Sequence, residues 1–185
     1  MGEWKPAEWY DAAYRSDPNL TDHVGSTFAP LWDRIALEVP PNRHVVDVGC
    51  GTGPMLPRLG GQALTYRGVD WSVAAIDAAR AAFPSVSGSF RVGDVLAALP
   101  FIWRRPGCVV LAVEVLEHLE HDIEFIRACG PECQVIASLP SRDSESHLRH
   151  FASADDVLAR YGPFFREGAT CVPFDQWFIL RGVTR

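Results

Sequence analysis

The sequence contains almost no lysine and no long hydrophobic run. Lys5 is the only lysine, so arginine supplies nearly all of the 17 basic residues, and the net charge is −6. An acidic chain argues against a broad phosphate-binding surface, so we do not expect nucleic acid as a partner. No apolar run approaches the roughly 20 residues of a membrane helix, and the amino terminus is too polar for a signal peptide. We therefore expect a cytoplasmic protein without membrane contact.

The five cysteines include no C-x-x-C pair. Their odd number and their spacing indicate reduced, mostly buried thiols in a cytosolic protein. A chain of 185 residues is long enough to form one domain with a substantial core. We expect a helical appendage or lid over residues 1–42 and the core of the domain over residues 43–185. The sequence does not indicate an oligomeric state.

Strand and helix signals alternate along most of the chain. Helices are expected over 8–15 and 22–37, the latter with a break at Pro30, and then over 72–82, 114–128 and 153–161. Strands are expected over 45–48, 64–70, 89–92, 109–113, 134–139, 169–174 and 177–183. Alternation of this kind predicts an α/β fold with a doubly wound, mostly parallel seven-stranded sheet. No helix separates the last two strands, so the sheet should end in an antiparallel hairpin.

A glycine-rich turn follows the strand at 45–48. The run H-V-V-D-V-G-C-G-T-G over 44–53 contains Asp47 and the glycines Gly49, Gly51 and Gly53. Glycine allows positive φ angles and close approach of a ligand, and a turn at the end of a strand directs backbone N–H groups toward that ligand. A dinucleotide-binding fold requires G-x-G-x-x-G, whereas Pro54 occupies the third glycine position here. The turn therefore argues against a nicotinamide-dependent dehydrogenase.

The D-x-G-x-G-x-G string resembles motif I of the class I S-adenosylmethionine-dependent methyltransferases, whose Rossmann-like sheet also ends in an antiparallel hairpin. The resemblance implies S-adenosylmethionine as the cofactor. Asp70, at the end of the second strand, would accept hydrogen bonds from the ribose hydroxyls. Asp94, beside Val95, would bind the adenine amino group. Trp71 would stack on the adenine. The alternatives are that both aspartates serve as turn or cap residues and that Trp71 covers the core.

A second motif, E-x-x-E-H, begins at Glu114. A helix over 114–128 would place Glu114, Glu117 and His118 on one face, opposite an apolar seam. The motif resembles two methyltransferase groups, the ubiquinone-pathway O-methyltransferases and the small-RNA 2′-O-methyltransferases. In the latter, two glutamates and two histidines hold a divalent cation. The resemblance implies that these three residues and His150, with His147 as its rival, would bind Mg²⁺, Mn²⁺, Fe²⁺ or Zn²⁺. Glu114 would also belong to the residues that bind the cofactor.

Two alternatives to the metal site remain open at this point. The polar stripe could be the exposed face of an amphipathic helix. Without a metal, His118 or His150 alone could act as a general base, and Glu117 is the third candidate for a catalytic residue.

Aromatic side chains are concentrated before residue 43. Tyr10 and Tyr14 are four residues apart, on one face of the first expected helix, and are our candidates for the substrate pocket. The alternative is that such rings only seat the helices on the sheet.

We expect an O-methyltransferase acting on a hydroxyl group of a catechol-like or diol-like small molecule. The alternatives are an RNA 2′-O-methyltransferase and a cofactor-binding partner subunit without catalysis of its own.

Overall fold

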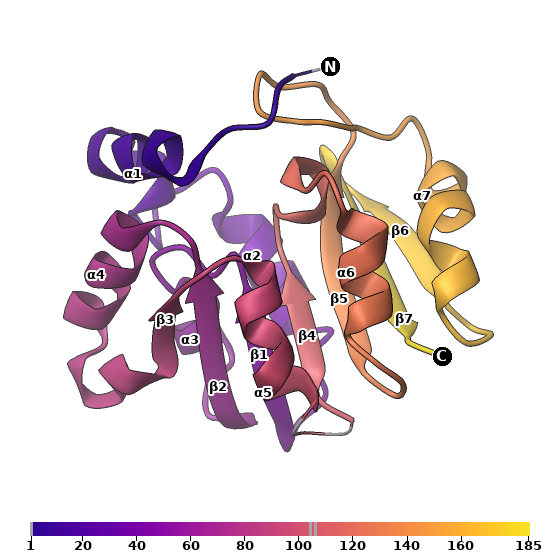
Figure 1. The fold of residues 1–185 in the computed structure, drawn as a ribbon, viewed down its shortest axis with the longest axis horizontal. Coiled ribbons are helices and arrows are strands. Elements are labelled where there is room, and N and C mark those ends of the chain that lie inside the picture. Colours follow the sequence, from indigo (N-terminus) through magenta and orange to yellow (C-terminus); the bar gives the residue numbers. More distant parts are fainter. Residues whose placement is uncertain (1, 104, 106) are drawn as a thin grey trace.

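The computed structural model describes residues 2–103, 105 and 107–185. A seven-stranded sheet in the order β3-β2-β1-β4-β5-β7-β6 forms the centre of the molecule (Figure 1). Its strands are β1 (Arg43–Val48), β2 (Ala63–Asp70), β3 (Phe90–Val92), β4 (Val109–Ala112), β5 (Gln134–Pro140), β6 (Thr170–Phe174) and β7 (Trp177–Val183). Strands β1 to β5 pair in parallel, and β7 runs antiparallel to both β5 and β6. The expected α/β fold with an antiparallel C-terminal hairpin is confirmed.

Helices cover both faces of the sheet. They are α1 (Ala7–Ser16), α2 (Ala29–Ala36), α3 (Met55–Arg58), α4 (Val73–Ala82), α5 (Leu99–Trp103), α6 (Asp122–Ala128) and α7 (Ala154–Tyr161). Short 3₁₀ helices lie at Pro18–Leu20, Pro84–Ser89, Val95–Ala98, Leu116–His118 and Gly162–Phe164. None of the described helices combines the length and the hydrophobicity that a membrane crossing requires.

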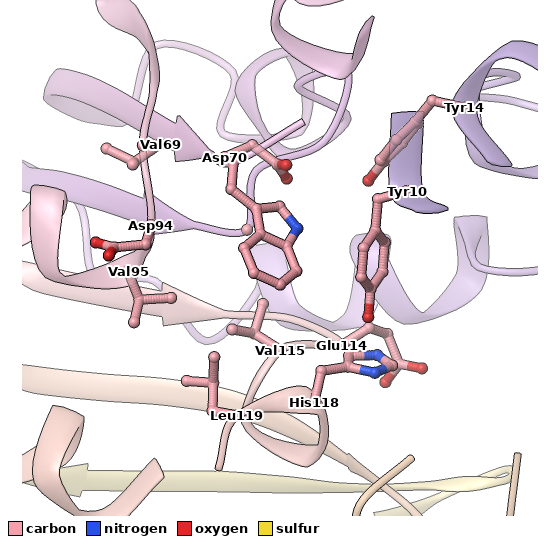
Figure 2. Close-up of a pocket in the computed structure, with 13 residues that line it drawn as sticks. Tyr10, Tyr14, Val69, Asp70, Asp94, Val95, Glu114, Val115, His118 and Leu119 are labelled. Atoms are coloured by element: carbon pink, nitrogen blue, oxygen red, sulfur yellow. The ribbon is translucent and has the colours of Figure 1, made fainter. Parts of the chain in front are cut away.

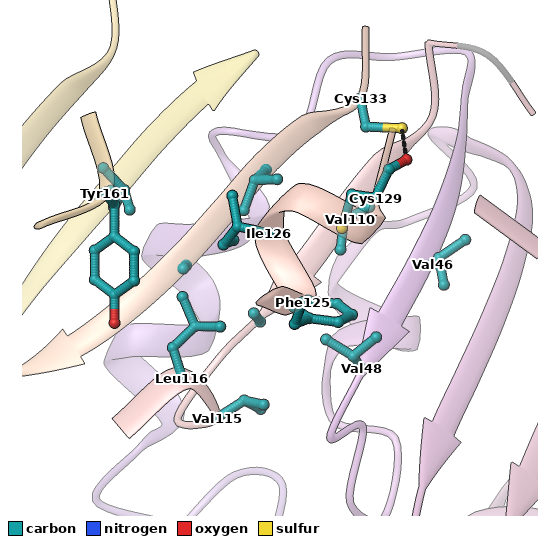
Figure 3. Packing of buried hydrophobic residues seen from close by; sticks show 14 of the residues in the cluster. Val46, Val48, Val110, Val115, Leu116, Phe125, Ile126, Cys129, Cys133 and Tyr161 are labelled. Atoms are coloured by element: carbon teal, nitrogen blue, oxygen red, sulfur yellow. Dashed lines mark hydrogen bonds between the residues drawn. The ribbon is translucent and has the colours of Figure 1, made fainter. Parts of the chain in front are cut away.

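The core consists of two clusters, one on each face of the sheet, because successive side chains of a strand point to opposite faces. In β1, Val45 packs with α2, α3 and α4, whereas Val46 and Val48 pack with α5, α6 and α7. Figure 3 shows the second cluster, in which Phe125 and Ile126 of α6 lie over the sheet. The five cysteines are free thiols, and four of them are buried.

The expected helix over 22–37 is shorter than predicted. The side chain of Asp22 accepts hydrogen bonds from the backbone amides of Val24 and Gly25, which holds this stretch in turns. Helix α2 starts only at Ala29, and Pro30 lies in its first turn instead of breaking it. A proline is tolerated there because the first amides of a helix have no intrahelical acceptor.

The expected continuous helix over 114–128 is wrong. A 3₁₀ turn covers Leu116–His118, and α6 starts only at Asp122. Glu114 has a φ of 56°, outside the helical region. Val115, Leu116 and Glu117 are all buried, and three consecutive residues cannot share one face of an α-helix. The proposed common helical face of Glu114, Glu117 and His118 therefore does not exist.

Candidate functional site

A pocket lies beyond the carboxyl ends of β1 to β4, at the point where the strand order reverses between β1 and β4. Figure 2 shows its residues, which come from the loops after these strands and from α1. They are Tyr10, Tyr14, Gly49, Val69, Asp70, Trp71, Gly93, Asp94, Val95, Glu114, Val115, His118 and Leu119. Nine residues that the sequence analysis singled out therefore meet at one pocket, whereas Asp47, Gly51, Gly53, Glu117 and His150 are not in its wall.

The glycine turn after β1 needs its glycines for both backbone angle and space. Gly51 has a φ of 53°, and a Cβ atom there would lie 2.7 Å from the Tyr14 hydroxyl oxygen. Gly49 has a φ of 63°, and its Cβ would lie 2.3 Å from a methyl carbon of Val115. The turn thus lets α1 and the loop after β4 approach the end of β1.

Two buried aspartates lie next to this turn, and Asp70 bonds to it directly. Asp70 accepts hydrogen bonds from the Gly51 amide (2.9 Å) and the Ser72 amide (2.8 Å). Its burial raises its pKa to about 6. Asp47 lies outside the pocket wall, and the Tyr66 hydroxyl donates to it over 2.6 Å. Burial raises the pKa of Asp47 to about 7. Asp70 therefore serves as a turn residue and as part of the pocket wall at once.

Asp94 also has two roles. One carboxylate oxygen accepts a hydrogen bond from the Ala97 amide (3.1 Å) and caps the 3₁₀ turn at Val95–Ala98. The residue nevertheless lines the pocket, next to Val95. Asp94 therefore caps the turn and lines the pocket at the same time.

Helix α1 covers the pocket with aromatic side chains. The ring centroids of Tyr10 and Trp71 are 5.4 Å apart. Those of Trp4 and Trp71 are 5.7 Å apart, in an edge-on arrangement. The ring of Tyr10 also lies 5.9 Å from that of His118. The space left inside the pocket is about 120 Å³, below the roughly 300 Å³ at the lower end of small-molecule sites.

Residues that the sequence analysis missed hold the cover in place. The carboxylate of Asp11 accepts hydrogen bonds from the Ser72 hydroxyl (2.6 Å) and the Ala74 amide (3.0 Å), which ties α1 to the start of α4. The amides of Gly2 and Glu3 donate to the carbonyls of His147 and Glu145. Figure 1 shows this N-terminal segment crossing to the long loop before α7. Asp11 lies within the helix expected over 8–15, and nothing in the sequence pattern indicated its contact with α4.

The carboxylates of Glu114 and Glu117 differ in their hydrogen bonding. Glu114 accepts a hydrogen bond from the Ser138 hydroxyl (2.7 Å) and another from the indole of Trp177. Glu117 is completely buried, and within the described part of the chain neither of its carboxylate oxygens has a hydrogen-bond partner. Burial raises the pKa of each of these glutamates to about 8.

Two histidines lie beside Glu117. The Nε2 atom of His118 is 3.9 Å from a carboxylate oxygen of Glu117, and the rings of His118 and His147 are 5.1 Å apart. Their Nδ1 atoms face the carbonyl oxygens of Ser146 (2.8 Å) and Arg142 (3.2 Å). A carbonyl only accepts, so Nδ1 carries the proton and Nε2 has a free lone pair when each ring is neutral. Burial lowers the pKa of both histidines, which favours that neutral form.

His147, not His150, belongs to this group. Ligand atoms of Glu117, His118 and His147 lie within 4.8 Å of one another. His150 is 40% exposed, and its Nδ1 lies 3.7 Å from a carboxylate oxygen of Asp143. The Leu148 amide donates a hydrogen bond to the Glu117 carbonyl. This contact brings the preceding residue, His147, close to the buried carboxylate of Glu117. Glu114 is not part of this group.

Arg149 links the same loop to the 3₁₀ turn. Its guanidinium donates to the carbonyls of Leu116 and Leu119 and lies 3.5 Å from the buried carboxylate of Asp122. Asp122 is held in turn by Arg160 and Tyr161. The turn that carries Glu117 and His118 is therefore fixed from two sides.

Comparisons with known proteins agree with this geometry. The sequence model of a methyltransferase domain matches residues 45–131. The ubiquinone biosynthesis O-methyltransferase of Ralstonia nicotianae is 28% identical over 162 residues, which cover 84% of this chain and 63% of that protein. The corresponding enzyme of Thiobacillus denitrificans is 30% identical over 122 residues, covering 63% and 52% of the two chains. The chain thus spans less than two thirds of the length of either relative.

Among solved structures, magnesium protoporphyrin IX methyltransferase from Synechocystis PCC 6803 with bound SAM superposes with a TM-score of 0.61 at 18% identity, covering 100% of both chains. At this identity the match concerns the fold alone. Together, the sheet order, the glycine turn and the sequence matches make the chain similar in fold and sequence to class I S-adenosylmethionine-dependent methyltransferases.

Proposed function

We propose that the protein transfers a methyl group from S-adenosylmethionine to a hydroxyl oxygen of a catechol-like or diol-like small molecule. The observation that carries this proposal is the group formed by the buried Glu117 and the half-buried His118 and His147, of which His118 lines the pocket. Acidic and neutral imidazole groups next to a methyl donor suit an acceptor that must lose a proton. The similarity to two ubiquinone biosynthesis O-methyltransferases supports an oxygen acceptor.

The cofactor would lie along the ends of β1 to β3. The backbone of the glycine turn would accommodate its charged amino acid part, Asp70 its ribose, and Asp94 with Val95 its adenine. Trp71 would cover the base, since base–aromatic stacking stabilises by about 1–3 kcal/mol. Because the rings of Tyr10 and Trp71 fill much of the pocket, we expect α1 to move outward when the cofactor enters.

The residues on the β4 side would prepare the acceptor. Tyr10 would position an aromatic acceptor, and Tyr14 would close the glycine turn behind it. The Nε2 atom of His118, which has a free lone pair in the neutral ring, would take the hydroxyl proton. Placing the oxygen in line with the methyl group supplies about 7–11 kcal/mol of the barrier reduction.

A divalent cation is the alternative to this base, because the single Nε2 lone pair of His118 binds either a proton or a metal. Glu117 is a buried carboxylate without hydrogen-bond partners, and the Nδ1 atoms of His118 and His147 face carbonyl oxygens. That orientation leaves Nε2 of each ring free for a metal, as in known metal sites. Glu117, His118 and His147 would hold the cation, and Glu114, bonded to Ser138, would lie outside the first ligand set. A bound cation would lower the pKa of an acceptor oxygen.

The experiment is methyl transfer from labelled S-adenosylmethionine to a panel of catechols and diols, with cofactor affinity measured on the same samples. His118→Ala should lower turnover by about 10²–10⁴-fold, the range of general acid–base catalysis, while cofactor affinity stays within about twofold. His121→Ala is the matched control, since His121 is exposed in the same loop, and should leave both quantities unchanged. Full turnover in His118→Ala would contradict the proposed base. Cofactor binding without turnover on any acceptor would favour a partner subunit.

A further inference from the structure

A second cleft lies around the earlier parts of β1 and β2, whereas the methyl-transfer pocket lies beyond the carboxyl ends of these strands. It is lined by His44, Val45, Val46, Thr65, Arg67, Gly88, Arg91, Phe101 and Arg105, with a volume of about 290 Å³. Its residues come from the first halves of β1 and β2, from β3 and from the region of α5. The two pockets share no residue.

The charged residues that line this cleft are basic. Arg67, Arg91 and Arg105 line it together with His44, and among the described residues no aspartate or glutamate does. Within the described residues none of these three arginines forms an ion pair, whereas nine other basic side chains outside the cleft pair with carboxylates. In a chain with a net charge of −6, three unpaired cations around one concavity make a local positive field that an anion would offset.

Neighbouring groups hold two of the guanidinium groups in place. One nitrogen of Arg67 donates to the Tyr66 carbonyl (3.1 Å) and to the Ser89 hydroxyl (3.1 Å). The guanidinium of Arg91 lies over the Phe101 ring, 5.2 Å from its centroid. Because these contacts use only part of the five N–H donors of an arginine, the remaining donors are available to a ligand and are already oriented.

From these observations we infer a binding site for a phosphate monoester of a small molecule. Guanidinium groups match the geometry of phosphate oxygens and can bind them in bidentate fashion. The Thr65 hydroxyl, 2.9 Å from Nδ1 of His44, adds a polar group to the cleft wall. At about 30 Å³ per water molecule, the cleft has space for roughly ten waters, which is more than one inorganic phosphate requires. The organic part of the ligand would contact Phe101, an apolar residue of the cleft wall that is only partly buried.

This site is independent of the proposed methyl transfer. A ligand bound there would not compete with S-adenosylmethionine, because the two pockets share no wall. Cofactor affinity therefore serves as a measure of correct folding in every variant of the cleft.

The test is isothermal titration of the full chain with ribose 5-phosphate, inorganic phosphate and unphosphorylated ribose. We expect ribose 5-phosphate to bind and ribose not to bind, and we expect the affinity to fall as ionic strength rises. Arg91→Gln should weaken binding by about tenfold, the loss of one hydrogen bond to a charged group. Inorganic phosphate binding as tightly as ribose 5-phosphate would also support the site and would identify the phosphoryl group alone as the recognised part.

Arg127→Gln is the matched control, since Arg127 lies 4.8 Å over the ring of Phe164 in a comparable contact outside the cleft. It should leave the affinity for ribose 5-phosphate unchanged. The inference is overturned if neither phosphate probe binds at millimolar concentration. It is also overturned if Arg91→Gln and Arg67→Gln, each with normal cofactor affinity, bind ribose 5-phosphate like the unmodified chain, or if only an acidic macromolecule binds the cleft.

Discussion

At the scale of single residues, we expect one added carbon atom in the glycine turn to weaken cofactor binding. Gly51 combines a φ of 53° with a Cβ position 2.7 Å from the Tyr14 hydroxyl. In Gly51→Ala, the left-handed backbone costs about 1–2 kcal/mol, and the contact pushes α1 away. We expect cofactor affinity, measured by calorimetry, to fall at least about tenfold. Gly61→Ala is the control, because Gly61 has a φ of 80° and open space around its Cβ position. Equal cofactor affinity in the two variants would contradict the steric part of this account.

The buried carboxyl group of Asp47 predicts a pH-dependent stability. Burial raises its pKa to about 7 from a usual value of 3.8. Between these values the folded chain holds the proton more tightly than the unfolded chain, so stability falls as the pH rises through about 7. Asp47→Asn should remove part of this decline and raise the free energy of unfolding at pH 8 by at least about 1 kcal/mol. Denaturant unfolding from pH 4 to 8 measures it.

Tyr66→Phe provides a second test of the pKa of Asp47. The Tyr66 hydroxyl donates to Asp47 and favours its charged form. Removing this donor should raise the pKa of Asp47 further, so that the decline in stability continues to higher pH. A pH profile that is identical in all three proteins would show that Asp47 does not titrate in this range.

The choice between His147 and His150 is the sharpest residue-scale test of the cation. Only His147 shares the group with Glu117 and His118, whereas His150 lies beside Asp143. After chelation and addition of Mn²⁺ or Zn²⁺, His147→Ala should lose stoichiometric metal binding, because one of three ligands is gone. His150→Ala should keep it. The reverse result would restore His150 as a ligand, and no binding in the unmodified chain would leave His118 as a base without metal.

At the scale of elements, α1 is held to the molecule by few contacts. It has no buried residue, and Asp11 bonds it to the start of α4. Asp11→Ala should therefore loosen α1 with little change in the unfolding temperature. We expect faster hydrogen exchange over residues 7–16 and faster release of S-adenosylmethionine in stopped-flow measurements. Glu8→Ala, an exposed acid of the same helix, should change neither. Unchanged exchange in Asp11→Ala would mean that other contacts hold the helix.

The elements also show what the sequence could predict. The alternation of strand and helix signals identified the parallel sheet, and the continuously apolar segment of β4 is typical of a strand buried on both faces. The 114–128 segment was misjudged because its polar residues recur at helical spacing. In the structure Glu117 is buried by tertiary contacts, and Leu148 and Arg149, both distant in sequence, fix its turn. Local periodicity carries no information about such partners.

At the scale of the whole molecule, the fold separates two sites by charge. The pocket beyond the carboxyl ends of β1 to β4 contains Asp70, Asp94 and Glu114, whereas the cleft beside α5 contains Arg67, Arg91 and Arg105. The sequence analysis predicted the first site, because its residues follow the carboxyl ends of strands in a recognisable order. It did not predict the second, because arginines on alternate strand positions resemble an ordinary solvent-exposed face until the strands are placed side by side.

The measurement that tests the central claim most directly is calorimetric titration of the full chain with S-adenosylmethionine. We predict one binding site per chain, with an affinity that Asp70→Asn reduces because the carboxylate both lines the pocket and holds the Gly51 and Ser72 amides. Absence of binding to the folded, unmodified chain at millimolar cofactor would contradict the proposed function.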